Sequence, residues 1–276
     1  MPAVSKLNHV VGHIKMTDRD FKTEFDSIIK EVIAPIFKAN GFKKNGNNFY
    51  RDLGEVGQAF NVQQSQWNSK DDKTFVFNLG LLDKELQNEI YQRELPKFPK
   101  EYDCEIRLRH GQLMNKGDVW YDLNKRTDLE KLKNQISKDL ENFVLPFFNK
   151  YQDPKKWIEF FDWKFEPITG PIGKFLIIEK YGERARADKF WNDLYNEALV
   201  PKSQVSEIRT KDGQVFRDES EPTVNHEWVK RIEDFAEKKK VKLEIRPTTT
   251  AISKRADSDK RNDNTIKKLW SMLKGK

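Results

Sequence analysis

Cysteine is almost absent from this chain, which has 276 residues and one cysteine, Cys104. A single cysteine cannot form an intrachain disulfide and cannot supply a cysteine-rich zinc site. Long apolar runs are missing too, and the first residues, MPAVSKLNHVVGHIKM, lack the continuous apolar core of a signal peptide. We therefore expect a cytoplasmic protein without a membrane span.

The motifs of common enzyme classes are also missing. The sequence has no glycine-rich phosphate loop, no nucleophile elbow and no HExxH zinc motif. Of the four histidines, His110 is the best-placed general base if the neighbouring Arg109 binds a substrate. Asp162 and Lys164 have the acid-x-lysine spacing of a magnesium nuclease but lack a second acidic ligand. We therefore expect no catalytic residue, no metal site and no cofactor.

Net positive charge is almost absent outside the C-terminal segment, although the net charge of the chain is +7. Residues 246–276 hold nine Lys and Arg against three Asp, which leaves 42 basic and 41 acidic residues in the rest of the chain. A nearly neutral body argues against a basic DNA-binding domain. Nineteen Phe and seven Trp are enough to build a hydrophobic core.

Helical and strand patterns predict an α+β fold. Apolar positions three and four residues apart from Phe21 to Ile33 indicate a helix capped by Thr17 or Asp18, and a second helix is expected over 127–150. Alternating patterns predict strands at 47–53, 58–67, 73–82 and 103–113, with a short fifth strand within 119–123. The prediction is an antiparallel sheet of about four to five strands, packed on one face by the two helices.

The predicted strands carry amides where a buried strand would carry apolar residues. Because side chains alternate along a strand, Phe60, Val62 and Phe77 belong to the face under the helices. The other face then displays Asn61, Gln63, Ser65, Asn78, Arg107 and Arg109. Amides offer donors and acceptors, and arginine offers a fork for carboxylate or phosphate. This face is either a solvated surface or a recognition surface, with Trp67 and Trp120 near its rim as anchors.

Five segments carry a resemblance to a known family. They are GFKKNGNNFYR (41–51), NVQQSQW (61–67), FVFNLGLL (75–82), IRLRHGQL (106–113) and GDVWYDL (117–123), in this order between two helices. Over about residues 20–150 the chain resembles the bacterial family catalogued as domain of unknown function 4304. That family has no established activity, so the resemblance implies an α+β bacterial domain with Gln63, Ser65 and Asn78 inside its motifs.

Beyond residue 152 the patterns are mainly helical. Helices are expected at 154–165, 183–199 and 223–240, and a hairpin at Asp212-Gly213. Residues 173–182 have the composition of a strand, although the length of this segment also suits the start of a helix. The expected domains are an α+β domain with its lead-in (1–152), a mainly helical region packed on it (153–247), a flexible linker (248–264) and a short basic amphipathic helix (265–276).

The last segment, NDNTIKKLWSMLKGK, is the most distinctive feature of the sequence. Its apolar residues Ile266, Leu269, Trp270 and Leu273 follow helical spacing and are flanked by lysines. The polar linker before this segment would let it extend away from the domain. The segment therefore either folds back on its own domain or docks into a groove of a partner. The lysines also suit an anionic membrane surface or a nucleic-acid backbone.

These features predict a protein-binding module rather than an enzyme. By analogy with other bacterial domains of unknown function, we expect an accessory subunit of a multi-component system, such as an antiviral-defence or toxin-related operon. Its contact surfaces would be the polar sheet face and the C-terminal helix. One alternative is nucleic-acid binding through the basic tail and the Arg107/Arg109 face, and a second is a metal-dependent nuclease using Asp162 and Lys164.

Overall fold

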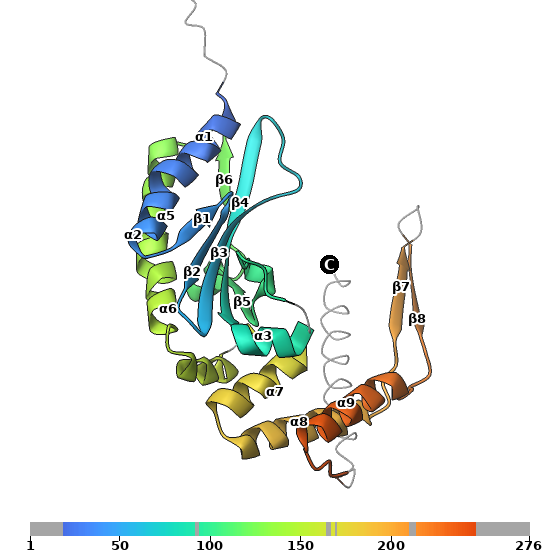
Figure 1. Ribbon diagram of the computed structural model, residues 1–276. Coiled ribbons are helices and arrows are strands. Elements are labelled where there is room, and N and C mark those ends of the chain that lie inside the picture. Colours follow the sequence, from blue (N-terminus) through green and yellow to red (C-terminus); the bar gives the residue numbers. More distant parts are fainter. Residues whose placement is uncertain (1–18, 92–93, 164–166, 169, 210–213, 247–276) are drawn as a thin grey trace, which may run out of the picture. The chain divides into compact units, whose positions relative to one another are not determined.

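The computed structural model describes residues 19–91, 94–163, 167–168, 170–209 and 214–246 (Figure 1). The chain divides into two compact units, with the boundary between Arg184 and Ala185. In the described ranges, no helix combines the length and the apolar character needed to cross a bilayer. The predicted linker and C-terminal helix, with Ile266, Leu269, Trp270 and Leu273, lie outside the described residues.

The first unit is built on a six-stranded antiparallel sheet. Five strands are neighbours in chain order: β1 (Lys43–Asn45), β2 (Asn48–Asp52), β3 (Val56–Gln64), β4 (Asp72–Asp83) and β5 (Ile106–Arg109). β4 is long enough to pair on one side with two strands, β6 (Tyr121–Asn124) along its first part and β5 along its second. The predicted α+β class is confirmed, and the sheet has one strand more than the expected maximum.

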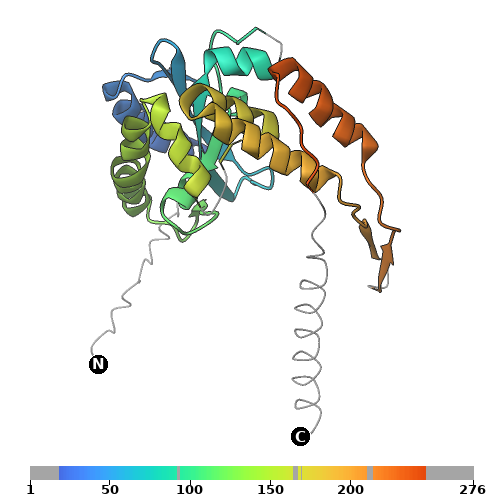
Figure 2. The same ribbon diagram turned by 90° about the horizontal axis from the view of Figure 1, so that it is seen from below.

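Two long helical segments cover one face of this sheet and lie side by side in both views (Figure 1 and Figure 2). The first joins α1 (Phe21–Ser27), the π-helical η1 (Ile28–Ile33) and α2 (Ala34–Ala39). The second joins α5 (Leu129–Asp139), the π-helical η3 (Leu140–Val144) and α6 (Leu145–Lys150). Asp20 caps the first segment through the backbone N–H groups of Lys22 and Thr23, so the expected cap at Thr17 or Asp18 is wrong.

Each helical segment widens into a π-helical stretch shortly before a proline. Pro35 and Pro146 lie at the start of α2 and α6, directly after η1 and η3. A proline ring clashes with the carbonyl four residues earlier and has no N–H to donate. The wider π turn separates the ring from that carbonyl. The helices therefore continue through both prolines instead of ending there.

Aromatic side chains form the core between these helices and the sheet. The ring of Phe37 on α2 contacts those of Phe42, Phe49, Phe60 and Phe148, with centroids 4.2 to 6.4 Å apart. Phe60, Val62 and Phe77, which alternation placed on this face, are buried, and so are Phe75, Leu79, Ile106 and Leu108. A fully buried phenylalanine contributes about 1.5 to 3 kcal/mol to folding, so this layer holds the sheet rigid beneath its other face.

The opposite face of the sheet is covered along only part of its length. There Tyr50, Ala59, Leu82 and Cys104 form a small second core, closed by Leu95 and Phe98 from the connection between β4 and β5. Only glycine fits at position 80, because a β-carbon there would lie 2.5 Å from Cys104 Sγ. This end of the face is therefore closed, and the polar residues occupy the remainder.

Further helices follow the strands of the first unit. α3 (Lys84–Tyr91) comes directly after β4, and α4 (His110–Leu113) is a single turn directly after β5. The 3₁₀ helix η4 (Pro154–Asp162) precedes α7 (Gly170–Tyr181), which replaces the strand expected at 173–182. Four consecutive residues from Phe175 to Ile178 are buried, so α7 is covered on all sides. A continuous apolar run fits a buried helix as well as a buried strand.

The second unit contains two packed helices and a hairpin. α8 (Arg184–Ala198) contacts α9 (His226–Lys239) through Trp191, whose indole nitrogen donates to the Ile232 carbonyl at 3.1 Å. β7 (Val205–Arg209) and β8 (Val215–Glu219) pair as a two-stranded antiparallel ribbon. The hairpin expected from the sequence is therefore present.

Candidate functional site

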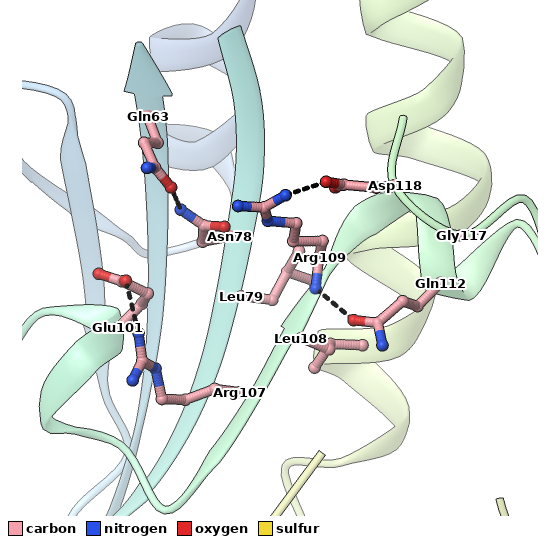
Figure 3. A pocket seen from close by; sticks show the side chains of 10 residues that line it. All are labelled: Gln63, Asn78, Leu79, Glu101, Arg107, Leu108, Arg109, Gln112, Gly117 and Asp118. Carbon is pink, nitrogen blue, oxygen red and sulfur yellow. Dashed lines mark hydrogen bonds and ion pairs between the residues drawn. The ribbon is translucent and has the colours of Figure 1, made fainter. Parts of the chain in front are cut away.

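The polar part of the sheet face contains a pocket of about 460 Å³ (Figure 3). Four of the six residues predicted for this face line it, and these are Gln63, Asn78, Arg107 and Arg109. β3, β4 and β5 each contribute to this group. Alternation along three strands therefore brings together side chains that are far apart in the sequence.

The other two predicted residues lie beside the pocket and do not line it. Asn61 lies between Asn48 and Asn78 in the sheet and contacts both. Ser65 follows the end of β3, where its Oγ accepts a hydrogen bond from the backbone N–H of Trp67. The Trp67 side chain is 83% exposed.

A row of amides crosses the sheet and ends at the pocket. Asn48, Asn61, Asn78 and Arg109 occupy directly opposite positions on β2, β3, β4 and β5. Asn61 donates to Asn48 Oδ1 at 2.8 Å, and Asn78 Nδ2 donates to Asn61 Oδ1 at 3.2 Å. Asn78 Nδ2 also donates to Gln63 Oε1 at 2.8 Å (Figure 3). The amides satisfy one another, and their mutual bonds fix the orientation of Gln63 and Asn78.

Arg109 is held from two sides at the end of this row. Its guanidinium pairs with the Asp118 carboxylate, and its Cζ lies 5.2 Å from the centroid of the Trp120 ring. Trp120 Nε1 donates to the same carboxylate at 3.2 Å. Gly117, at φ +69°, makes the turn that returns Asp118 to the sheet. Partial burial opposes ionisation of Asp118, but the hydrogen bonds from Arg109 and Trp120 outweigh it and lower its pKa.

Arg107 has a looser arrangement. Its Nη2 lies 3.2 Å from Glu101 Oε1, and the side chain is 42% exposed whereas that of Glu101 is 11% exposed. Its backbone N–H donates to the Pro167 carbonyl at 2.7 Å, which fixes the outer edge of β5. The two arginines and the two carboxylates, Glu101 and Asp118, balance, so the pocket is neutral overall.

Hydrogen-bond donors remain available in this pocket. A guanidinium has five N–H groups, and among the described residues each pocket arginine has one carboxylate as its side-chain hydrogen-bond partner. Within the described residues, Gln63 Nε2 and Asn78 Oδ1 have no hydrogen-bond partner. The pocket thus offers N–H groups of Arg107, Arg109 and Gln63, together with one amide oxygen. Such an arrangement suits a ligand group rich in acceptor oxygens.

His110 cannot act as a base in this pocket. It is buried and lies in the core, 5.0 Å from the ring of Phe77 and 5.1 Å from that of Tyr121, measured between centroids. Burial lowers its pKa to about 4, so the imidazole is neutral near pH 7. The expectation of a general base at His110 is therefore wrong, and alternation from Leu108, two positions earlier on the core face, would have indicated a core position.

The remaining chemical candidates lie elsewhere. Asp162 ends η4, and Lys164 lies outside the described residues. Across the ranges that the structure describes, no group of three or more His, Cys, Asp and Glu side chains could hold a metal ion. Cys104 is buried, and burial raises the pKa of its thiol well above its usual value.

Sequence reasoning missed three residues that line the pocket: Glu101, Gln112 and Asp118. All three come from connections, where alternation gives no information. Gln112 had a detectable signal. In a capping box, a Gln or Glu three residues after the N-cap accepts a hydrogen bond from the backbone N–H of the N-cap residue. Gln112 Oε1 accepts from the Arg109 N–H at 2.7 Å in this way.

Comparison with known proteins gives one match. Residues 33–150 match the model of the family described as Domain of unknown function (DUF4304). No curated protein and no solved structure matches the chain. The matched segment contains all six strands of the sheet and every residue that lines the pocket. Residues 33–150, the segment that holds the sheet and the pocket, are thus similar to the DUF4304 family, in agreement with the resemblance carried by the sequence motifs.

Proposed function

We propose that this chain is a non-enzymatic protein-binding module whose pocket holds a carboxylate group of a partner protein. The observation that carries the proposal is the pair Arg107 and Arg109, whose guanidinium groups line one pocket and retain N–H donors. A carboxylate accepts two such bonds from one guanidinium, and charge-assisted pairs are the stronger class of hydrogen bond. Trp120 beside Arg109 adds a large aromatic surface of the kind found at interface centres.

The charge balance of the pocket favours a protein over a nucleic acid. A nucleic-acid site gains most of its affinity from uncompensated Lys and Arg that neutralise several phosphates. Here Glu101 and Asp118 already neutralise both arginines. Their effect is to hold the guanidinium groups in place, which suits recognition of a single carboxylate better than of a phosphate chain.

The chemistry of the pocket also supports binding rather than catalysis. A general acid or base works best with a pKa near the working pH. The pKa of Asp118 is lowered instead, and the nearest histidine, His110, is buried away from the pocket. The expected role is that of an accessory subunit that contacts another protein of the same system.

The C-terminal segment is proposed as a second contact, on sequence grounds alone. Ile266, Leu269, Trp270 and Leu273 form one apolar stripe, and the linker 248–264 before them is polar. Two linked contacts raise the apparent affinity for a partner beyond that of either contact alone.

Affinity purification from the native cell tests the pocket. The baits are the wild-type chain, Arg107→Gln, Arg109→Gln and the control Arg126→Gln, which removes the same charge at an exposed position after β6. Thermal unfolding by circular dichroism verifies that each bait is folded. We expect one protein to be retained by the wild type and the control and lost with both pocket variants. Equal retention by all four baits, or recovery of nucleic acid alone, would overturn the proposal.

A further inference from the structure

A second pocket, of about 490 Å³, lies in the same unit on the other side of α4. Its apolar wall comes from Phe143, Pro146, Phe147, Tyr151 and Trp163. Phe143 and Trp163 are half-buried, and Pro146 is exposed. The pocket therefore presents partly exposed rings instead of a closed core, which is typical of a binding site for an apolar side chain.

The charges at this second pocket are already paired. Lys150 Nζ lies 2.6 Å from Glu159 Oε2, and the Tyr151 hydroxyl donates to the same oxygen at 3.1 Å. The hydrogen bond between them lowers the pKa of Glu159 and raises that of Lys150, so the pair stays charged at neutral pH. An occupant of this pocket thus gains from the rings rather than from a free charge.

Gln112 lines both pockets, so the two are neighbours that share a wall at the single turn of α4. Its Oε1 is occupied by the Arg109 N–H, which holds the side chain at the dividing wall. A helix with its side chains is about 10 Å wide. An extended peptide advances about 3.3 Å per residue and its side chains alternate sides, so two side chains that enter the pockets on either side of this wall are about two or four positions apart.

We propose that the partner segment is an extended peptide with an acidic residue in the Arg107/Arg109 pocket and a large apolar residue, two or four positions away, in the Phe143/Trp163 pocket. This inference rests on the proposed function and specifies its ligand. The remaining N–H donors of Arg107 and Arg109 place the acidic residue, and the shared Gln112 wall sets the spacing. The apolar segment of this chain, residues 265–276, has no acidic residue and does not fit the pattern.

A peptide-display selection tests the inference. Random ten-residue peptides displayed on phage are selected on the immobilised full chain, on Arg109→Gln, on Phe143→Asn and on the control Arg126→Gln. We expect the wild type and the control to enrich peptides with Asp or Glu two or four positions from Phe, Trp, Leu or Met. Arg109→Gln removes the acidic preference and Phe143→Asn removes the apolar preference, each weakening a selected peptide about tenfold. Trp163→Gln provides a second test if Phe143→Asn fails to fold.

The other outcomes separate the inference from the function beneath it. Enrichment of acidic peptides without an apolar residue at fixed spacing overturns the inference and leaves the carboxylate pocket standing. Enrichment of apolar peptides alone, or none above an uncoated surface, overturns both. Peptides that resemble residues 265–276 would assign the second pocket to this chain's own C-terminal segment instead of a partner.

Discussion

Arg109 and Asn78 lie directly opposite each other on β5 and β4, so the guanidinium that pairs with Asp118 extends a row of amides across the sheet. The row begins at Asn48 on β2. It connects the rigid centre of the sheet, where β4 is buried on its helix side, to the pocket at its edge. The orientation of the side chains that line the pocket therefore depends in part on Asn48 and Asn61, which do not line it.

The amide row gives the first prediction. Asn78→Ala removes the donor to Asn61 and Gln63 and leaves Gln63 without its partner in the row. We expect a loss of about 1 kcal/mol in the free energy of unfolding and weaker peptide binding, because Gln63 is no longer held at the pocket. Urea denaturation and fluorescence anisotropy with a selected peptide measure the two effects.

Asn48 provides the control for this prediction. It occupies the far end of the row and accepts a hydrogen bond from Asn61 at 2.8 Å. Asn48→Ala is expected to cost similar stability while binding stays unchanged. If both variants bind peptide as well as the wild type, the amide row stabilises the sheet and plays no part in the site.

Arg109→Lys gives the second prediction. Lysine keeps the positive charge but loses the planar fork and the stacking on Trp120. We expect stability to change by less than about 1 kcal/mol, because the pair with Asp118 is partly exposed. Binding of an acidic peptide should fall about tenfold, with a smaller fall for Arg126→Lys. Undiminished binding by Arg109→Lys would mean that charge alone, and not the fork, attracts the ligand.

How much of this arrangement the sequence predicts depends on the kind of element. Period-two alternation correctly placed Gln63, Asn78, Arg107 and Arg109 on one face, because the sheet keeps its register across β3, β4 and β5. Glu101, Gln112 and Asp118 reach the pocket from connections, whose path depends on turns and not on periodicity.

The errors have separate physical causes. The helix α7 was expected as a strand because a continuous apolar run has no period that distinguishes the two. The π turns come directly before Pro35 and Pro146, where the wider turn accommodates the proline ring, and the spacing of apolar residues does not reveal them. The sequence did not predict that part of the second face is closed. Leu95 and Phe98 close it by packing over Tyr50, and alternation along the strands says nothing about the path of the connection that carries them.

The C-terminal segment gives the third prediction. A chain that stops at Pro247 lacks the stripe of Ile266, Leu269, Trp270 and Leu273. We expect it to retain the fold of the described units and to bind selected acidic peptides as the full chain does. Retention of the native partner should fall, because one of two linked contacts is lost. Affinity purification with both chains measures this, and equal retention would remove the segment from the proposed interface.

A buried carboxyl group gives the fourth prediction, which concerns pH. Glu105 is fully buried beside the end of β4, where its Oε2 accepts the Asp83 N–H at 2.9 Å. Burial, with a smaller contribution from the Asp83 charge, raises the pKa of Glu105 to about 8, although the hydrogen bond from the Asp83 N–H and the charge of Lys180 oppose the shift. Tyr181 and Lys180 on α7 also contact Asp83, so this proton lies under the junction of α7 and the sheet.

The sign of the effect follows from proton binding. Near pH 7 the folded chain keeps the Glu105 proton, whereas the unfolded chain, with an ordinary carboxyl pKa of about 4.3, has lost it. The stabilising contribution is complete below pH 4 and is lost progressively as the pH rises to about 8. Glu105→Gln keeps an acceptor for the Asp83 N–H and has no proton to lose. We expect this variant to gain stability relative to the wild type as the pH rises from 5 to 8.

Urea denaturation of wild type, Glu105→Gln and the exposed control Glu227→Gln at pH 5, 6.5 and 8 measures this difference. The free energy of unfolding of Glu105→Gln relative to wild type should rise at each step, and that of Glu227→Gln should stay level. A constant difference across the three pH values would mean that Glu105 is ionised in the folded chain and that Lys180 balances its charge. In that case Lys180→Met, which removes the balancing charge, should destabilise the chain most at pH 8.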